Sequence, residues 1–315
     1  MSIKEHYQQL CEKEPIPIFM QDWWLDVVCG KNNWKPILAL DKKGQILGAM
    51  TYYCTKKWGV SLITQPLLTP FSGIWMRPYP KPDDTANLYS YQVKITNELI
   101  EQILTTTFYQ QNMMPSFQNW LPFHWAGYRQ TTRYTYVFEN TNDLDKIKEG
   151  FRSSVRKNIN KALRNITITE SNDLERFYEI NQCSFKKKLG YMPYSLAMLK
   201  QLDQQLLQKK ARKLYFAQDS EGNLHSAGYF IYDTQTMYFL ASGMNINFKT
   251  SSITAIVWKA LEDAKDLGIC FDFEGSMLSE VAEFNQAFGA TLKPYFRIYK
   301  AQNRFWSIVS TVFGK

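Results

Sequence analysis

The feature that most constrains the fold of this chain is an internal repeat of a hairpin-like segment. Residues 36–53 and residues 214–232 each hold an apolar run, a short Asp-x-x-Gly segment and a second apolar run. Glycine readily adopts the positive φ that a tight turn needs, and aspartate can accept hydrogen bonds from the backbone of its own turn. Residues 41–44 and 219–222 are therefore predicted to be the turns of two β-hairpins.

The segments after each hairpin also match in kind and in order. Each hairpin is followed by a strand-like run, a helical pattern, and a glycine ahead of an aromatic strand. These segments are 60–63, 87–107 and 134–138 in the first half, and 236–244, 252–267 and 295–299 in the second. Because a repeated supersecondary pattern is the sequence signature of repeated structure, the chain is predicted to be a tandem of two related α+β units.

The second half gives the more detailed order of elements, read from its hydrophobic periodicity and its turn residues. The predicted order is a basic helix at 144–165, a strand at 166–169, helices at 174–189 and 194–210, three antiparallel strands, a helix from 252, a strand at 270–274, a short helix at 279–288 and a final strand. From the strand at 166–169 onward, this order resembles the GNAT acyltransferase fold.

Four short segments extend the resemblance to one group of proteins. Residues 156–162 (RKNINKA), 271–275 (FDFEG) and 284–289 (FNQAFG) resemble segments of the FemABX-like transferases, also described as FemAB-like or BioF2-like, which contain two GNAT units in tandem. Residues 125–128, followed by Thr135 and Tyr136, resemble the end of their first unit. One position departs from the pattern, since Asn285 stands where the aminoacyl-tRNA-using members carry a lysine near the reacting centre.

The resemblance implies a division of the chain into three parts. We expect a degenerate GNAT-like domain at 1–143, a GNAT-like domain with the donor cleft at 144–300, and an amphipathic tail at 301–315 that packs back on the first domain. In the family the degenerate unit tends to contribute to acceptor binding. Trp75 lies in a segment that is similar to a loop of that unit. The resemblance therefore makes Trp75 a candidate substrate-binding residue.

The resemblance also places the acyl donor where the fourth and fifth strands of a GNAT unit separate. The donor's pyrophosphate then lies at the N-terminus of the next helix, where unpaired N–H groups and the helix dipole attract anions. Ordinary acetyl-CoA enzymes carry a Gly-x-Gly loop there, whereas this chain has GMNINFKTSS at 243–252. The candidate donor ligands are Lys249, Thr250, Ser251 and Ser252. The alternative is a plain helix N-cap, for which serine and threonine are well suited.

The helix predicted at 144–165 combines an apolar stripe, repeating every four residues, with many cations. Arg152 and Arg156 flank the stripe and can reach a binding groove, whereas Lys157, Lys161 and Arg164 lie about opposite the stripe. Arg156 is the further candidate donor ligand, because a guanidinium can hold a phosphate with two parallel hydrogen bonds. Arg152 is a candidate substrate ligand, and a solvated basic face is the alternative for both.

Two carboxylates at the end of a predicted strand are the candidate catalytic residues. Asp272 and Glu274 alternate with Phe271 and Phe273, so the two acids share one face of the strand. A half-buried carboxylate with a raised pKa can take a proton from an attacking amine. The alternative is that Asp272 caps the following loop and is structural. The further candidate substrate-binding residues are Tyr232, Phe284 and Asn285.

Composition narrows the class of protein. The 37 Lys and Arg residues exceed the 29 Asp and Glu residues, and the net charge of +8 favours anionic partners. Five scattered cysteines without a C-x-x-C pair indicate reduced thiols in the cytoplasm. No run approaches the 18 apolar residues of a membrane span, and no P-loop, Ser-His-Asp set or metal-binding motif is visible.

These observations lead us to expect a cytoplasmic N-acyltransferase that moves an acyl group from an activated donor to an amine, with neither a metal nor a covalently bound cofactor. Asn285 favours acyl-CoA as the donor, whereas the missing Gly-x-Gly loop and the basic helix favour charged tRNA. With charged tRNA, the resemblance implies the addition of an amino acid to a peptidoglycan-precursor peptide. A non-catalytic binding module with the same fold is the alternative from another functional class.

Overall fold

The computed structural model describes residues 1–57, 59–248, 251–275 and 277–302. It divides into two compact units. The first comprises Met1–Arg133 together with the residues from Pro294 onward, and the second comprises Tyr134–Lys293. No helix among the described residues is both long enough and apolar enough to cross a membrane.

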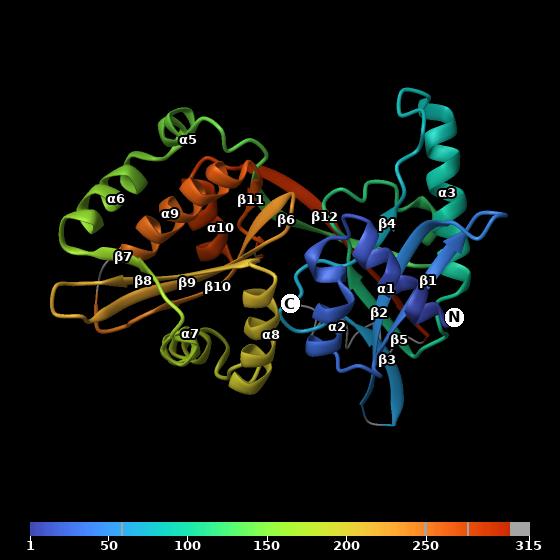
Figure 1. Cartoon of the computed structure of the whole chain (residues 1–315), viewed down its shortest axis with the longest axis horizontal. Helices are drawn as coiled ribbons and strands as arrows, with labels where there is room; N and C mark the ends of the chain where they lie inside the picture. Colours follow the sequence, from blue (N-terminus) through green and yellow to red (C-terminus); the bar gives the residue numbers. More distant parts are fainter. Residues whose placement is uncertain (58, 249–250, 276, 303–315) are drawn as a thin grey trace. The chain divides into compact units, whose positions relative to one another are not determined.

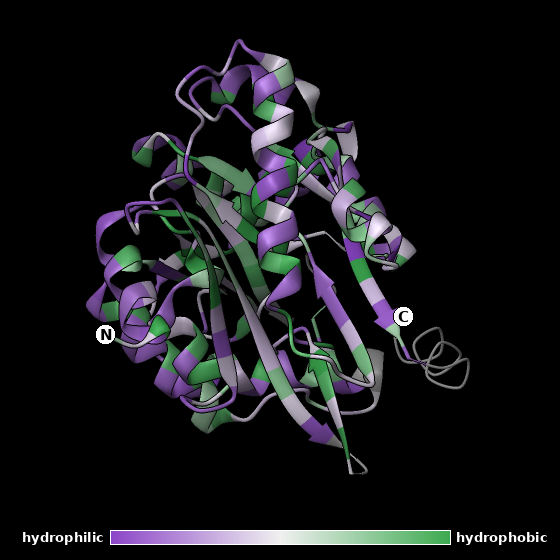
Figure 2. Cartoon of the chain, turned by 90° about the vertical axis from the view of Figure 1, so that its right-hand side faces the viewer, coloured by the Kyte–Doolittle hydropathy of each residue, from purple (hydrophilic) through white to green (hydrophobic). Residues whose placement is uncertain are grey.

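The first unit is a mixed sheet with helices against it (Figure 1). Its elements are α1 (Ile3–Lys13), η1 (Ile18–Met20), α2 (Asp22–Val28), β1 (Trp34–Leu40), β2 (Ile46–Lys57), β3 (Val60–Thr64), β4 (Ile74–Met76), α3 (Thr85–Glu101), β5 (Phe108–Asn112), α4 (Leu121–Trp125), the first half of β6 (Arg129–Phe138) and most of β12 (Thr291–Ala301). The strand order is β1-β2-β3-β5-β12, and β4 pairs with β2 off this path. Among the strand pairs described for these strands, β3 and β5 run parallel and the others run antiparallel. Figure 2 shows α3 with hydrophilic and hydrophobic residues interspersed, and its Ile95 and Leu99 are buried in the core of this unit.

The second unit is also a mainly antiparallel sheet. Its elements are the second half of β6, α5 (Leu144–Gly150), α6 (Ser153–Asn165), β7 (Thr167–Glu170), α7 (Leu174–Leu189), α8 (Leu196–Gln208), β8 (Arg212–Gln218), β9 (Leu224–Tyr232), β10 (Thr236–Met244), α9 (Ser252–Leu267), β11 (Cys270–Asp272) and α10 (Ser279–Ala287). The strand order is β7-β8-β9-β10-β11-β6. Of the pairs described in this order, β10 and β11 run parallel and the others run antiparallel. Helices α7 and α8 lie on one face, and α5, α6, α9 and α10 lie on the other (Figure 1).

Both predicted hairpins are present, and their turns are stabilised in the same way. Asp41 accepts hydrogen bonds from the N–H groups of Lys43 and Gln45, each at 2.8 Å. Asp219 accepts the corresponding bonds from Glu221 at 3.0 Å and Asn223 at 2.9 Å. The glycine of each turn has φ near +80°. The mixed α+β sheet architecture predicted from these repeats is therefore confirmed.

The core of the second unit lies between its sheet and α9. Most of the first three turns of α9 are buried, including Ile256, Val257 and Leu261. On the opposite face, α8 is held by a buried polar group. The carboxylate of Asp203 accepts hydrogen bonds from Nε of Arg212 at 2.8 Å and from the hydroxyl of Tyr229 at 2.5 Å. A buried ion pair with this many partners fixes the position of α8 more than it adds net stability.

The two halves have exchanged their closing strands. The segment predicted to close the first half, residues 134–138 of β6, pairs with β11 of the second unit. The segment predicted to close the second half, in β12, pairs with β5 of the first unit. Along the chain, the boundaries between the two units therefore fall between Arg133 and Tyr134 and between Lys293 and Pro294. Sequence analysis set the boundaries after residues 143 and 300. Local patterns mark a strand but do not specify its partner. Residues 303–315 of the predicted tail lie outside the described residues.

Candidate active site

The two parallel strands of the second unit pair over a short length and then separate. The paired residues are Thr236 with Cys270, Met237 with Phe271 and Tyr238 with Asp272. Strand β11 ends at Asp272, whereas β10 continues to Met244 with a break in its register after Tyr238. The remainder of β10 therefore has no partner in β11. Sequence analysis placed the acyl donor at such a separation.

Asp272 is the last residue of β11 and its side chain is buried. The Thr135 hydroxyl on β6 donates to Oδ1 of Asp272, and the Glu274 backbone N–H donates to the same atom at 2.7 Å. Burial raises the pKa of Asp272 to about 6, although both hydrogen bonds favour the charged form. The two hydrogen bonds connect the Asp272 carboxylate to β6 and to the turn that follows β11.

The turn after β11 holds two consecutive residues in the left-handed region of backbone space. Glu274 has φ +60° and Gly275 has φ +56°. A Cβ atom on Gly275 would lie 2.1 Å from the carbonyl oxygen of Tyr134, so only glycine fits there. Glutamate is uncommon at positive φ, and such strain persists where the surroundings hold it and often marks a functional site.

The Glu274 carboxyl group is the most unusual polar group at this site. Its Oε1 is buried and has no hydrogen-bond partner among the described residues. Burial, reinforced by the negative charge of Asp272, raises the pKa of Glu274 well above its ordinary value. A carboxyl group whose pKa is raised in this way gives up its proton at a higher pH than an ordinary glutamate does. Its Oε1 can also accept a hydrogen bond from a bound molecule.

The two acids face away from the α9 core. Phe271 and Phe273 pack into that core, and side chains alternate along a strand. The two acids therefore point to the α7 and α8 face. Tyr194, just before α8, and Tyr238 of β10 are near enough that the charge of Glu274 adds to burial in raising the pKa of each hydroxyl.

Sequence analysis did not find the polar chain that surrounds Tyr194. The hydroxyl of Tyr194 donates to Oδ1 of Asn181 on α7 at 2.6 Å, and Nδ2 of Asn181 donates to the carbonyl of Ser242 on β10 at 2.6 Å. This chain connects the segment before α8 to the separated part of β10. Thr135 was noticed only as part of a resemblance, and no local signal marks Tyr194.

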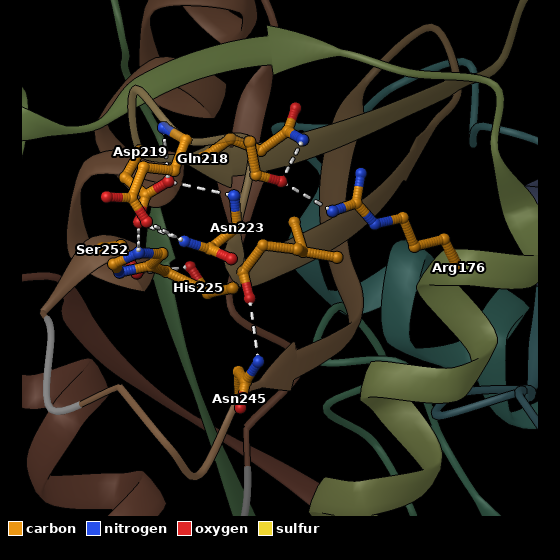
Figure 3. Close-up of polar contacts among 11 residues, drawn as sticks. Arg176, Gln218, Asp219, Asn223, His225, Asn245 and Ser252 are labelled. Carbon is orange, nitrogen blue, oxygen red and sulfur yellow. Dashed lines mark hydrogen bonds and ion pairs between the residues drawn. The ribbon is translucent and has the colours of Figure 1, made fainter.

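The start of α9 lies at the end of the loop that follows β10 (Figure 3). Ser251 is the N-cap residue but its side chain makes no capping hydrogen bond, and the first turn carries no acidic residue. Ser252 is buried, and its hydroxyl lies 2.8 Å from the hydroxyl of Ser226. Lys249 and Thr250, the other two candidate donor ligands, lie outside the described residues. Two of the four candidates, Ser251 and Ser252, are among the described residues. Ser252 is paired with Ser226, so the side chain of Ser251 is the one available to bind a donor.

A histidine connects the β8–β9 turn to the loop before α9. Nε2 of His225 lies 2.9 Å from Oδ2 of Asp219, and the ring stacks on Phe248 at 4.1 Å between centroids. The backbone carbonyl of His225 accepts a hydrogen bond from Asn245 at 2.9 Å. Hydrogen bonds from His225 and Asn223 lower the pKa of Asp219 to about 2. These contacts, several of which Figure 3 shows, hold the loop ahead of α9.

The guanidinium of Arg156 is bonded to the end of α5. Its Nη1 donates to the carbonyl oxygens of Lys148 at 3.3 Å and Glu149 at 3.0 Å, and also to that of Phe151. The last carbonyls of a helix lack intrahelical donors, so a cation is structurally useful there, although the carbonyl of Lys148 also accepts the Phe151 N–H at 3.2 Å. Arg152 is exposed at the N-cap of α6, and its Nη2 lies 3.4 Å from Oε1 of Gln286.

The remaining candidate substrate residues do not gather around the two acids. Tyr232 and Phe284 pack against the core that contains α9, on the other face of the sheet. Trp75 belongs to the first unit, where the guanidinium of Arg77 lies 5.5 Å from its ring centre. Asn285 is buried in α10, and its Nδ2 has no hydrogen-bond partner among the described residues.

Comparison with known proteins agrees with this geometry. The family described as "Acetyltransferase (GNAT) domain" matches residues 149–284. The structure of FemX superposes with a TM-score of 0.64 at 12% identity, covering 94% of this chain and 96% of FemX. The C-terminal domain of a putative lysylphosphatidylglycerol synthetase from Agrobacterium fabrum gives 0.58 at 8% identity, covering 98% and 94%. L-PGS from Bacillus licheniformis gives 0.52 at 11% identity, covering 88% of each chain.

A search of curated protein sequences finds no match. The structural likenesses lie at 8% to 12% identity, so they concern the fold. Together with the element order and the separation of β10 from β11, they confirm the resemblance noted in the sequence. The chain has a FemAB-like GNAT fold, and its residues 149–284 match the GNAT acetyltransferase domain family.

Proposed function

We propose that this protein transfers an acyl group from an activated donor to an amine, and that Glu274 is the general base. The observation that carries the proposal is the buried Oε1 of Glu274, which has no hydrogen-bond partner in the described part of the chain and lies just after the point where β10 and β11 separate. A protonated amine would supply that missing donor. The strained backbone at Glu274 and the fixed turn around it support a role that needs a defined position.

The proposed reaction begins with an acceptor ammonium group next to Glu274. The carboxylate takes one proton, and the neutral amine attacks the carbonyl carbon of the donor. The new C–N bond forms as the C–S bond of a thioester breaks, and the second amine proton passes to the leaving thiolate. Burial and the nearby charge of Asp272 raise the pKa of Glu274, and a carboxylate with a raised pKa accepts a proton from an amine more readily than an ordinary glutamate does.

Asp272 acts in this scheme as a positioning residue. Its carboxylate binds the Glu274 N–H and the Thr135 hydroxyl, which fixes the backbone on which Glu274 stands. Its charge also helps to raise the pKa of Glu274.

Acyl-CoA is the donor that we propose. The "Acetyltransferase (GNAT) domain" match over residues 149–284 supports this choice. So does the start of α9, whose first turn has no acidic residue to repel a pyrophosphate. The side chains of Ser251 and of Arg152 remain available for contacts with donor or substrate, whereas Ser252 is committed to Ser226 and Arg156 to α5.

A second candidate donor is a charged tRNA. It is favoured by the solvent-exposed cations of α6, namely Lys157, Lys161 and Arg164. A nucleic-acid donor bound by such cations loses affinity steeply as salt rises, whereas acyl-CoA loses little. Measuring donor affinity at two salt concentrations separates the two donors. With either one, the acceptor is an amine, and a cell-wall precursor is the acceptor class that the resemblance suggests.

The test of the proposed base is thiol release from acetyl-CoA in the presence of L-lysine, ethanolamine or glucosamine as trial amines. We expect amine-dependent release by the intact chain and a loss of about 10²- to 10⁴-fold in Glu274→Gln. Glu280→Gln, an exposed acid in the first turn of α10, is the matched control and should keep full activity. Equal rates in Glu274→Gln and the unaltered protein would remove Glu274 from the chemistry.

A further inference from the structure

The surface of the first unit has a shallow hollow of about 490 Å³, which is within the usual size of a small-molecule site. Its walls come from α4 and the residues next to it, from the start of β6 and from the end of β12. The lining residues are Trp120, His124, Gly127, Tyr128, Arg129, Gln130 and Tyr299. All seven belong to the first unit, so the hollow lies within one compact body.

The aromatic wall of the hollow is held in a fixed position. The ring of Trp120 meets the ring of His124 at 5.3 Å and that of Phe296 at 6.4 Å between centroids. Tyr128 is buried, and its ring meets that of Tyr109 edge-on at 5.1 Å. Trp120 remains half-buried, so part of its ring faces the solvent. The hollow therefore offers a preformed aromatic surface.

The polar side chains of the hollow are unused hydrogen-bond donors. Arg129 and His124 are exposed, and neither side chain has a hydrogen-bond or ion-pair partner in the part of the chain that the structure describes. Oε1 of Gln130 accepts from the hydroxyl of Thr132 at 3.4 Å, which leaves its Nε2 without an acceptor among the same residues. A ligand with several oxygen acceptors would match these donors.

The charge of the hollow is positive. None of the seven lining residues is acidic, and Arg129 contributes a guanidinium group. The Nζ atom of Lys300, which lies 4.8 Å from the ring centre of Tyr128, adds a second positive charge nearby. A guanidinium holds a carboxylate with two parallel hydrogen bonds, so a carboxylate complements this charge.

An open hollow that mixes aromatic and polar side chains suits a sugar ring better than a flat aromatic one. One face of a sugar ring carries C–H groups, which bury apolar area against an aromatic surface such as that of Trp120. The hydroxyl groups lie at the edge of the ring, where the planar ends of Arg129 and Gln130 can each donate to neighbouring oxygens. A flat aromatic ring would leave these donors without acceptors.

We propose that this hollow binds an acidic sugar, with the ring of the sugar against Trp120 and its carboxylate at Arg129. The hydroxyl groups of the sugar then accept hydrogen bonds from Gln130 and His124. This site is built from first-unit residues alone and does not depend on the acyl transfer proposed for the second unit.

The test is a saturation-transfer NMR titration of the intact chain with D-glucuronate and with D-glucose, which has a similar ring without the carboxylate. We expect D-glucuronate to bind, and to bind at least tenfold more tightly than D-glucose. Arg129→Gln should lower the affinity for D-glucuronate to that for D-glucose. Trp120→Leu should weaken the binding of D-glucuronate by tenfold or more.

Two control variants change similar residues outside the hollow. Lys43→Gln removes a positive charge from the exposed β1–β2 turn, and Trp125→Ala removes an exposed tryptophan that is not a lining residue. Both should bind D-glucuronate as the unaltered protein does. Arg129→Gln should also melt at the same temperature as the unaltered protein, which separates lost binding from lost folding.

The proposal is overturned if the unaltered chain does not bind D-glucuronate, or if Arg129→Gln binds it normally. It is also overturned if benzoate, which has the carboxylate but no hydroxyl groups, binds as tightly as D-glucuronate, because the hollow would then recognise a flat aromatic acid. Binding that is lost in Ser251→Asp and kept in Arg129→Gln would place the sugar at the start of α9 instead.

Discussion

The backbone N–H of Glu274 donates to Oδ1 of Asp272 at 2.7 Å, and this bond ties the proposed base to the residue that shapes its turn. The two acids lie two residues apart on one face, yet their surroundings differ. Asp272 receives two hydrogen bonds, whereas Oε1 of Glu274 receives none among the described residues. In the proposed reaction these different surroundings give the two acids different roles, Asp272 in positioning and Glu274 in proton transfer.

Asp272 should make the protein less stable as pH rises through the acidic range. Its pKa of about 6 in the folded protein exceeds the ordinary value of 3.8, so the folded state holds the proton more tightly than the unfolded state does. Binding of this proton adds about 3 kcal/mol to the free energy of unfolding below about pH 4, and this contribution is lost between about pH 4 and 6. Urea unfolding from pH 4 to 8 should show this decline, to which the raised pKa of Glu274 contributes with the same sign, and Asp272→Asn should make the decline smaller. Asp266→Asn, at an exposed position on α9, is the control and should retain the decline.

Gly275 should tolerate no side chain. Gly275→Ala would combine positive φ with a Cβ placed 2.1 Å from a backbone oxygen, so we expect a loss of more than about 3 kcal/mol in unfolding free energy. Gly222→Ala is the matched control, because Gly222 has φ +80° and open space around its Cβ position. That variant should lose only about 1–2 kcal/mol. Similar losses in the two variants, measured by urea unfolding, would contradict the close contact at Gly275.

Arg156 should matter for stability more than for donor binding. Arg156→Gln removes the hydrogen bonds to the last carbonyls of α5, and we expect a loss of about 1–2 kcal/mol with no change in acetyl-CoA affinity. Lys157→Gln, at the adjacent exposed position, should change stability by less than about 0.5 kcal/mol. A tenfold loss of acetyl-CoA affinity in Arg156→Gln would instead favour the phosphate contact inferred from the resemblance.

The order of elements could be predicted from the sequence because local patterns determine it. The two Asp-x-x-Gly turns use hydrogen bonds within five residues, and the buried stripe of α6 follows from its spacing. Likewise, the alternation of Phe271 and Phe273 with the two acids already assigns their faces. These features need no knowledge of which distant segments meet.

The rest of the site depends on contacts between distant residues. Thr135 reaches Asp272 across 137 positions of sequence, because residues 134–138 pair with β11 and do not stay in the first unit. Tyr194 is linked to β10 through Asn181, and neither residue stands in a recognisable motif. The side chain of Arg156 bonds to α5 because that helix ends at Gly150, which the prediction of one continuous helix at 144–165 did not foresee.

The most direct test of donor binding in the second unit is titration of acetyl-CoA into the intact chain, Ser251→Asp and Ser251→Asn. Aspartate is a good N-cap and should leave α9 at least as stable, but its charge opposes an anion at the helix start. Asparagine caps equally well without that charge. We predict binding by the unaltered chain and by Ser251→Asn, with affinity at least tenfold weaker in Ser251→Asp. Absence of binding, or equal affinity in all three proteins, would contradict an acyl-CoA site at the start of α9.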